Sequence, residues 1–165
     1  MSRDIVFKKM ATELGVEFTD QIRAIPKYEV AIEDDGKLWL SGTLPRAGGM
    51  IAVQGHVGSE VSIEEAKRAA RICVLRALAI VRQSVGTLDR IRRVLRMTVY
   101  VNSAPGFTEQ SEVADAASEI LYALLAPNGG HTRTSVGVAQ LPKNGSVELD
   151  MVVALGERDA LSSTF

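Results

Sequence analysis

The chain has few of the features that mark secreted, membrane-spanning or nucleic-acid-binding proteins. It has one cysteine, Cys73, which excludes an internal disulfide and fits a reducing compartment. The formal net charge of −1 gives no overall attraction to nucleic acid or to an anionic membrane. No stretch approaches the roughly 18 consecutive apolar residues of a membrane-spanning helix, and charges throughout residues 1–15 argue against a secretory signal. We therefore expect a cytoplasmic protein that engages neither nucleic acid nor a membrane.

Histidine and cysteine, the usual ligands of zinc, are scarce as well. The two histidines, His56 and His131, are far apart in the sequence and have no carboxylate or cysteine at a ligand spacing, so we expect no metal site. What the chain does have is an average globular composition, with 46% apolar and 24% charged residues over 165 positions. That length predicts a single domain over 1–165, and the polar composition of 156–165 predicts a poorly ordered tail.

Hydrophobic periodicity and turn signals predict an α+β fold: a mixed sheet with two main helices on one face and a short N-terminal helix. Ser62 and Glu65 have the spacing of a capping box, which predicts the start of the longest helix. The turn sequence DDG at 34–36 predicts a hairpin, whereas the glycine-rich stretch 45–58 is expected to be irregular. The helices are expected at 4–14, 63–85 and 108–125. The strands are expected at 28–32, 37–44, 89–102, 132–140 and 146–155.

The strand at 132–140 has an unusual pattern of side chains. Val136 and Val138 alternate with Arg133, Ser135 and small residues, so one face carries a single guanidinium among very small neighbours. A solvated edge strand would normally carry several charges. The pattern indicates a pocket with one charged anchor, and the valines are expected on the buried face.

A tight turn near 141–145 would pair the last two strands as a hairpin. In that arrangement Ala139 lies close to Glu148, and Arg133 lies about 20 Å further along, at roughly 3.3 Å per residue. Arg133 and Glu148 could then not meet within one chain. If both serve one site, that site lies between two chains.

Four segments together resemble the YjgF/RidA (Rid) family, and the resemblance covers about residues 28–155. The most specific is the last, which has the family's R-x-x-V-x-V-x-x-LP-turn-E pattern. The segments are LWLSGTLP (38–45), SIEEAKRAARICVLRALAIV (62–81), LDRIRRVLRMTVYVNSAPGFTEQ (88–110) and TRTSVGVAQLPKNGSVELD (132–150). The segment VNSAPGFTEQ looks like that of a subgroup with an N-terminal extension, which implies that residues 1–27 are such an extension of the single domain.

The resemblance implies a chorismate-mutase-like fold and a homotrimer with clefts at its subunit interfaces. Family members with a complete site hydrolyse reactive enamines and imines to 2-oxo acids and ammonium, and they use no metal or organic cofactor. The implied ligand is therefore a small carboxylate or imino acid, and the implied protein partner is the chain itself.

The family's site residues map onto seven positions. Arg133 matches the arginine that binds a carboxylate, a task that suits the two parallel donors of a guanidinium. Glu148 matches the glutamate thought to activate the attacking water. Asp115 stands roughly where the family has an asparagine, and an extra carboxylate there would repel an anionic substrate. The remaining positions are expected to line the ligand: Tyr28, Ser41, Gly42 and Ser135.

Two alternatives remain open. A non-catalytic trimer could keep Arg133 and bind a small carboxylic metabolite or a protein partner. Alternatively, the basic cluster at 90–96 could cleave RNA. Strand alternation argues against this function, because it places Arg92 and Arg96 on one face of the strand and Arg93 on the other, so that they form no continuous basic patch. The chain also lacks the interleaved aromatic residues that stack on bases.

Overall fold

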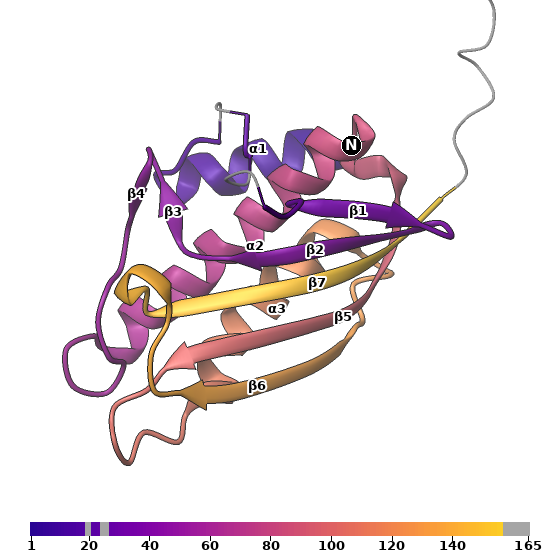
Figure 1. Cartoon of the computed structure of the whole chain (residues 1–165). Helices are drawn as coiled ribbons and strands as arrows, with labels where there is room; N and C mark the ends of the chain where they lie inside the picture. Colours follow the sequence, from indigo (N-terminus) through magenta and orange to yellow (C-terminus); the bar gives the residue numbers. More distant parts are fainter. Residues whose placement is uncertain (19–20, 24–26, 157–165) are drawn as a thin grey trace, which may run out of the picture.

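A five-stranded mixed sheet with helices on one face forms the computed structural model, which describes residues 1–18, 21–23 and 27–156 (Figure 1). The strand order is β1-β2-β7-β5-β6, and only β5 and β6 are parallel. The predicted α+β class is therefore confirmed. The predicted tail, 156–165, lies outside the described residues except for Gly156. The strands are β1 (Ala31–Asp34), β2 (Lys37–Thr43), β5 (Ile91–Asn102), β6 (Thr132–Val138) and β7 (Val147–Leu155).

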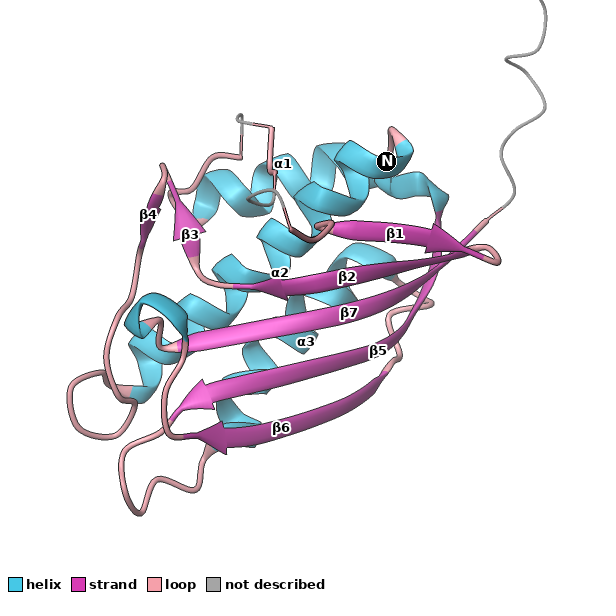
Figure 2. Ribbon diagram, in the orientation of Figure 1, coloured by secondary structure: helices cyan, strands magenta, loops and turns pink. Residues whose placement is uncertain are grey.

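The helices α2 (Ile63–Val85) and α3 (Gln110–Leu125) cover one face of the sheet, as predicted (Figure 2). The expected capping box forms at the start of α2, where the side chain of Ser62 accepts from the Glu65 amide and Glu65 accepts from the Ser62 amide. The N-terminal helix α1 (Arg3–Glu13) contacts α2 and α3. Within the described residues, no helix is long and apolar enough to cross a membrane.

Two tight turns close hairpins in the N-terminal half of the chain. Asp35 and Gly36 both have positive φ, 47° and 67°, as a two-residue hairpin turn requires, so the predicted β1–β2 hairpin is confirmed. The stretch expected to be irregular contains a second, shorter hairpin, β3 (Arg46–Ala47) and β4 (Met50–Ile51). Its turn glycines also have positive φ. This small hairpin fixes the backbone position of Arg46 beside the main sheet.

The predicted hairpin between the last two strands is wrong. β6 and β7 are not neighbours, because β5 lies between them. β6 follows α3 and adds to the sheet as a parallel partner of β5, which is how a crossover helix joins parallel strands. The connection over 139–146 then reaches past β5 to β7. Ala139 therefore does not pair with Glu148.

The faces of β6 are also the reverse of the prediction. Arg133 is in register with buried Met97, so it points to the helix side, and Ser135 follows it. Val136 is in register with Tyr100 and is 38% exposed on the face that carries no helix. That open face also bears two large exposed side chains, Ile32 (57% exposed) and Trp39 (53% exposed), which are cross-strand partners. Because the open face is partly apolar, alternation alone could not tell which face of β6 is buried.

Candidate functional site

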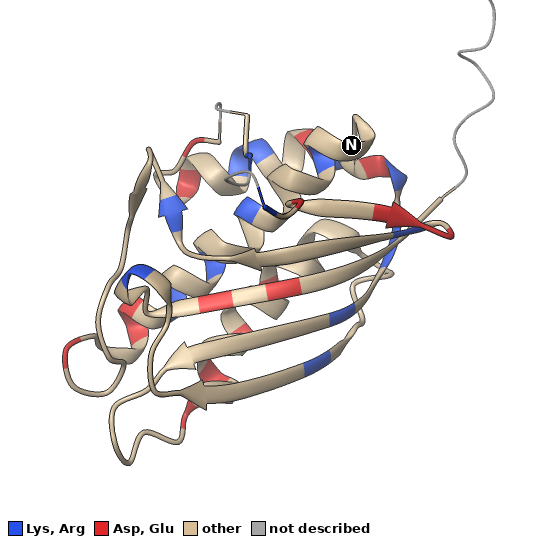
Figure 3. Cartoon of the chain, viewed as in Figure 1, with Lys and Arg blue, Asp and Glu red and all other residues tan. Residues whose placement is uncertain are grey.

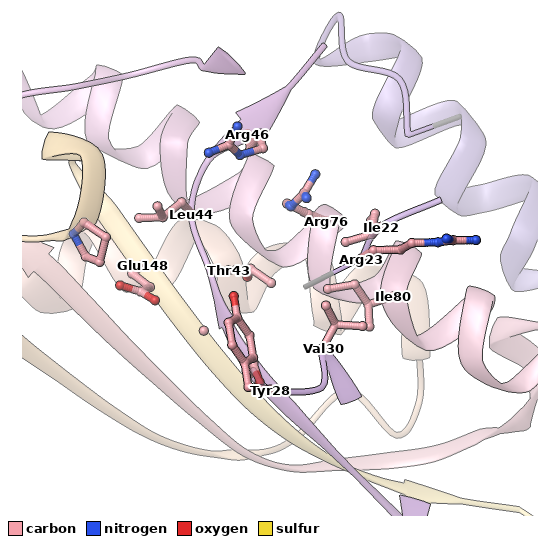
Figure 4. Close-up of a pocket in the computed structure, with 13 residues that line it drawn as sticks. Ile22, Arg23, Tyr28, Val30, Thr43, Leu44, Arg46, Arg76, Ile80 and Glu148 are labelled. Atoms are coloured by element: carbon pink, nitrogen blue, oxygen red, sulfur yellow. The ribbon is translucent and has the colours of Figure 1, made fainter. Parts of the chain in front are cut away.

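A cavity of about 390 Å³ lies at the end of β2 and is lined by four of the predicted site residues. Figure 4 shows its walls, which come from β2, β7, α2 and the segment before β1. Ile22 and Arg23 belong to the N-terminal extension, so that extension forms part of the cavity wall. The predicted residues that line it are Tyr28, Ser41, Gly42 and Glu148.

Glu148 is the only carboxylate among the described residues that line this cavity. Its side chain makes no hydrogen bond or ion pair to any other described residue. Burial raises the pKa of Glu148, and the negative charge of Asp150 raises it further. Asp150 in turn accepts a hydrogen bond from the Tyr100 hydroxyl at 3.1 Å. Figure 3 shows both acidic positions on β7. A half-buried carboxylate with a raised pKa and no partner is suited to proton transfer.

Gly42 makes room for the Glu148 carboxylate. A Cβ atom at Gly42 would lie 2.1 Å from Oε1 of Glu148, far closer than atoms in contact can approach. The neighbouring Ser41 hydroxyl donates to the Glu29 carbonyl at 2.6 Å, and the Ser41 amide donates to Val30 at 3.0 Å. These bonds attach the segment around Tyr28 to β2. Ser41 thus has a positioning contact in addition to its place in the cavity wall.

Sequence reasoning missed three arginines that line the same cavity. Arg23 is exposed, and its guanidinium donates to Gln21. Arg46 donates to the Gly49 carbonyl at 2.7 Å. Arg76 is partly buried and has no hydrogen bond or ion pair to another described residue. One signal in the sequence could have revealed it: Arg76 lies three residues after Cys73 and four before Ile80, on the buried stripe of α2.

The other three predicted residues lie elsewhere, between β6 and α3. Arg133 Nη1 donates to Asp115 Oδ1 at 2.7 Å and to the Ser118 hydroxyl at 2.9 Å. The hydroxyls of Ser135 and Ser111 are 3.2 Å apart. The structure therefore brings Arg133 and Asp115 together and places both outside the cavity that contains Glu148.

Within one chain, Arg133 and Glu148 lie on opposite faces of the sheet. Arg133 is in register with Met97 on the helix side, and Glu148 is in register with Tyr100 on the open side. Three residues along β5 and two strand spacings across it separate their backbones by roughly 14 Å. The predicted hairpin was wrong, but the β5 register also keeps Arg133 and Glu148 of one chain apart.

Two further expectations concern metal and cysteine chemistry. Among residues 1–18, 21–23 and 27–156, no three His, Cys, Asp or Glu side chains are grouped so as to hold a metal ion. Cys73 is fully buried, and burial raises the pKa of its thiol. It belongs to the core, as its place on the apolar stripe of α2 predicted.

Comparisons with known proteins agree with this architecture. The chain matches a family described as "YjgF/chorismate mutase-like, putative endoribonuclease" over residues 9–155. Protein TCP17 of Trypanosoma cruzi is 36% identical over 143 residues, which are 86% of this chain and 89% of that protein. The crystal structure of Atu1372, a protein of unknown function from Agrobacterium tumefaciens, is 38% identical with a TM-score of 0.84, covering 93% of this chain and 95% of that one. A protein from Shewanella oneidensis described as a "putative endoribonuclease" is 25% identical with a TM-score of 0.82, covering 90% and 99%.

Proposed function

Because the chain belongs to the YjgF/Rid family, we propose that it hydrolyses small reactive 2-imino acids to 2-oxo acids and ammonium. The observation that carries the proposal is the Glu148 carboxylate. It lies in a cavity of about 390 Å³, has no hydrogen bond or ion pair among the described residues, and has a raised pKa. A general base needs this combination of access, a free lone pair and a pKa moved toward neutrality.

The proposed reaction uses water and the chain's own side chains. Glu148 accepts a proton as water attacks the imine carbon, which gives a tetrahedral intermediate with a new C–O bond and a C–N single bond in place of the C=N double bond. Glu148 returns the proton to the nitrogen, the hydroxyl proton is lost as the C=O bond forms, and the C–N bond breaks. The ammonia that leaves takes up a proton and becomes ammonium. The products are a 2-oxo acid and ammonium, and no oxidant, metal or organic cofactor is consumed. An enamine first tautomerises to the imine.

The carboxylate of the substrate would be held by Arg133 of a neighbouring copy in a homotrimer. Two observations support a shared cleft. Arg133 and Glu148 lie on opposite faces of one chain's sheet, so only two chains can supply both to one ligand. The open face presents exposed Ile32 and Trp39, and burial of large apolar side chains drives association.

An imine-hydrolysis assay tests the proposal. An amino-acid oxidase or a dehydratase generates the imine in the presence of semicarbazide, which traps it, and the loss of imine is followed with and without this protein. Acceleration that falls at least a hundredfold in Glu148→Gln supports the proposal. The matched control is Glu112→Gln, which changes an exposed glutamate on α3 and should leave the rate unchanged. Equal rates with and without the protein, over several imines, would contradict it.

One observation favours a second candidate, a non-catalytic protein that binds small carboxylates. Among the described residues, Asp115 and Ser118 contact only Nη1 of Arg133, so its other guanidinium nitrogens can bind a carboxylate whether or not Glu148 acts as a base. Titration with 2-oxobutyrate separates the candidates when combined with the activity assay. Saturable binding without any acceleration of imine hydrolysis would assign the binding function.

A further inference from the structure

Two arginines from different elements line the same part of the cavity. Arg46 comes from the short hairpin strand β3, and Arg76 comes from the buried stripe of α2 (Figure 4). Both also line a smaller adjoining cavity of about 150 Å³. Burial lowers the pKa of Arg76, and the positive charge of Arg46 lowers it further. Because both side chains line the same two adjoining cavities, their positive charges lie near one another and repel.

No carboxylate of the described residues neutralises this pair. Glu148 lies in the same cavity but forms no ion pair with either arginine, and Glu17, which lines the adjoining cavity, forms none with them either. Partly burying a positive charge beside another one is unfavourable unless an anion compensates. Arg46 uses one nitrogen on the Gly49 carbonyl, which leaves donors on both guanidinium groups.

The cavity is consequently polarised. Glu148 supplies the negative end. Arg46 and Arg76, together with the exposed Arg23, supply the positive charges, and Thr43 is among the side chains drawn between Glu148 and Arg76 in Figure 4. A volume of about 390 Å³ accommodates a compound of about five carbons with ease. Pairs of guanidinium groups suit carboxylate or phosphate oxygens, since each offers two parallel donors.

We propose that Arg46 and Arg76 form an anion-binding subsite in the same chain as Glu148, and that the ligand therefore has a second anionic group besides the carboxylate at carbon 1. The class we assign is the dicarboxylic 2-imino acids and their 2-oxo acid products. This assignment of substrate class rests on the proposed function, whereas the anion subsite itself can be tested by binding alone.

A matched pair of ligands isolates the second charge. 2-Oxoglutarate and its 5-methyl ester differ in one group, a carboxylate in the first and a neutral ester in the second. Isothermal titration of the wild-type protein should give a Kd for 2-oxoglutarate at least tenfold lower than that for the 5-methyl ester. A 2-oxo acid with a phosphate at carbon 3, 3-phosphohydroxypyruvate, shows whether phosphate is preferred over carboxylate as the second group.

Variants of the two arginines test the assignment. Arg76→Gln and Arg46→Gln should each remove most of the preference for 2-oxoglutarate and leave the affinity for the 5-methyl ester unchanged. Arg68→Gln is the control, because Arg68 is exposed on the same helix and does not line the cavity. Equal affinities for the two ligands, or a preference that survives in both variants, would overturn the subsite. Binding with this preference but without imine hydrolysis would refute only the catalytic function.

Discussion

The guanidinium of Arg133 is held by Asp115 of the same chain, with Nη1 2.7 Å from Oδ1. The residue expected to anchor a substrate carboxylate thus already has a carboxylate partner. The pair is partly exposed, and such ion pairs contribute about 0.2–1 kcal/mol. A substrate carboxylate can therefore compete with Asp115 for Arg133, and its binding would break the Arg133–Asp115 ion pair.

Asp115→Asn should strengthen the binding of monocarboxylates by up to about fivefold, because an amide competes for Arg133 less well than a carboxylate does. Isothermal titration with 2-oxobutyrate measures this. Asp35→Asn is the control, since it neutralises another exposed aspartate that pairs with Lys37, far from the site. Weaker binding in Asp115→Asn would show instead that Asp115 orients Arg133 for the ligand.

Gly42→Ala should abolish most of the imine hydrolysis while the protein stays folded. The new methyl group would occupy the place of the Glu148 carboxylate, only 2.1 Å from Oε1, and would displace that flexible side chain. Gly130→Ala provides the control, because a Cβ there meets no atom within 4 Å. Activity and thermal melting are measured on both variants. Full activity in Gly42→Ala would show that the position of Glu148 does not matter.

Asp150→Asn should move the acidic limb of the pH–rate profile to lower pH. Glu148 must be ionised to act as a base, so the rate falls as the pH drops through its pKa. The negative charge of Asp150 disfavours ionisation and raises that pKa, and its removal lowers the pKa again. Asp34→Asn, at the far end of β1, should leave the profile in place. If the acidic limb stays at the same pH in Asp150→Asn, the group that titrates in this limb is not Glu148.

Trp39→Glu should dissociate the protein into monomers, because it places a charge on the exposed apolar part of the open face. The matched control is Tyr122→Glu, which changes an equally exposed aromatic residue on α3. Light scattering after size-exclusion chromatography gives the mass of each. If the wild-type protein and both variants have the same mass, the open face is not the surface through which copies associate.

Neutralising Arg92 and Arg96 together, with glutamine at both positions, should leave imine hydrolysis unchanged. Both side chains are exposed on β5, and neither lines the cavity that contains Glu148. The same variant tests the RNA alternative when a labelled RNA replaces the imine. RNA cleavage by the wild-type protein that disappears in this variant but persists in Arg133→Ala would favour a nuclease.

Local signals in the sequence predicted most of the fold. The capping box at Ser62 and Glu65 and the turn at Asp35 and Gly36 involve residues within a few positions of one another, so short segments suffice to specify them. The order of strands in the sheet depends on contacts between distant segments, so no short segment specifies it. Nothing within 132–155 shows that β5 inserts between β6 and β7, and the predicted hairpin failed for that reason.

The part of the candidate site that matches the family's sequence pattern could be predicted from the sequence. Tyr28, Ser41, Gly42 and Glu148 do line one cavity. Arg76 was missed because an arginine in a helix is usually solvated, and its position between Cys73 and Ile80 on the buried stripe of α2 was not taken into account. The partner of Arg133 was likewise hidden, since Asp115 meets it only when α3 packs on β6.

The central claim is that Arg133 and Glu148 act on one substrate from two different chains. Complementation tests it most directly: Arg133→Ala and Glu148→Gln are each inactive alone, and the two are then co-expressed in equal amounts. If neighbouring chains share each cleft, random mixing leaves roughly a quarter of the clefts with both native side chains, and about that fraction of imine hydrolysis returns. If mixed assemblies form and remain as inactive as the single variants, the two residues do not form a site shared between chains.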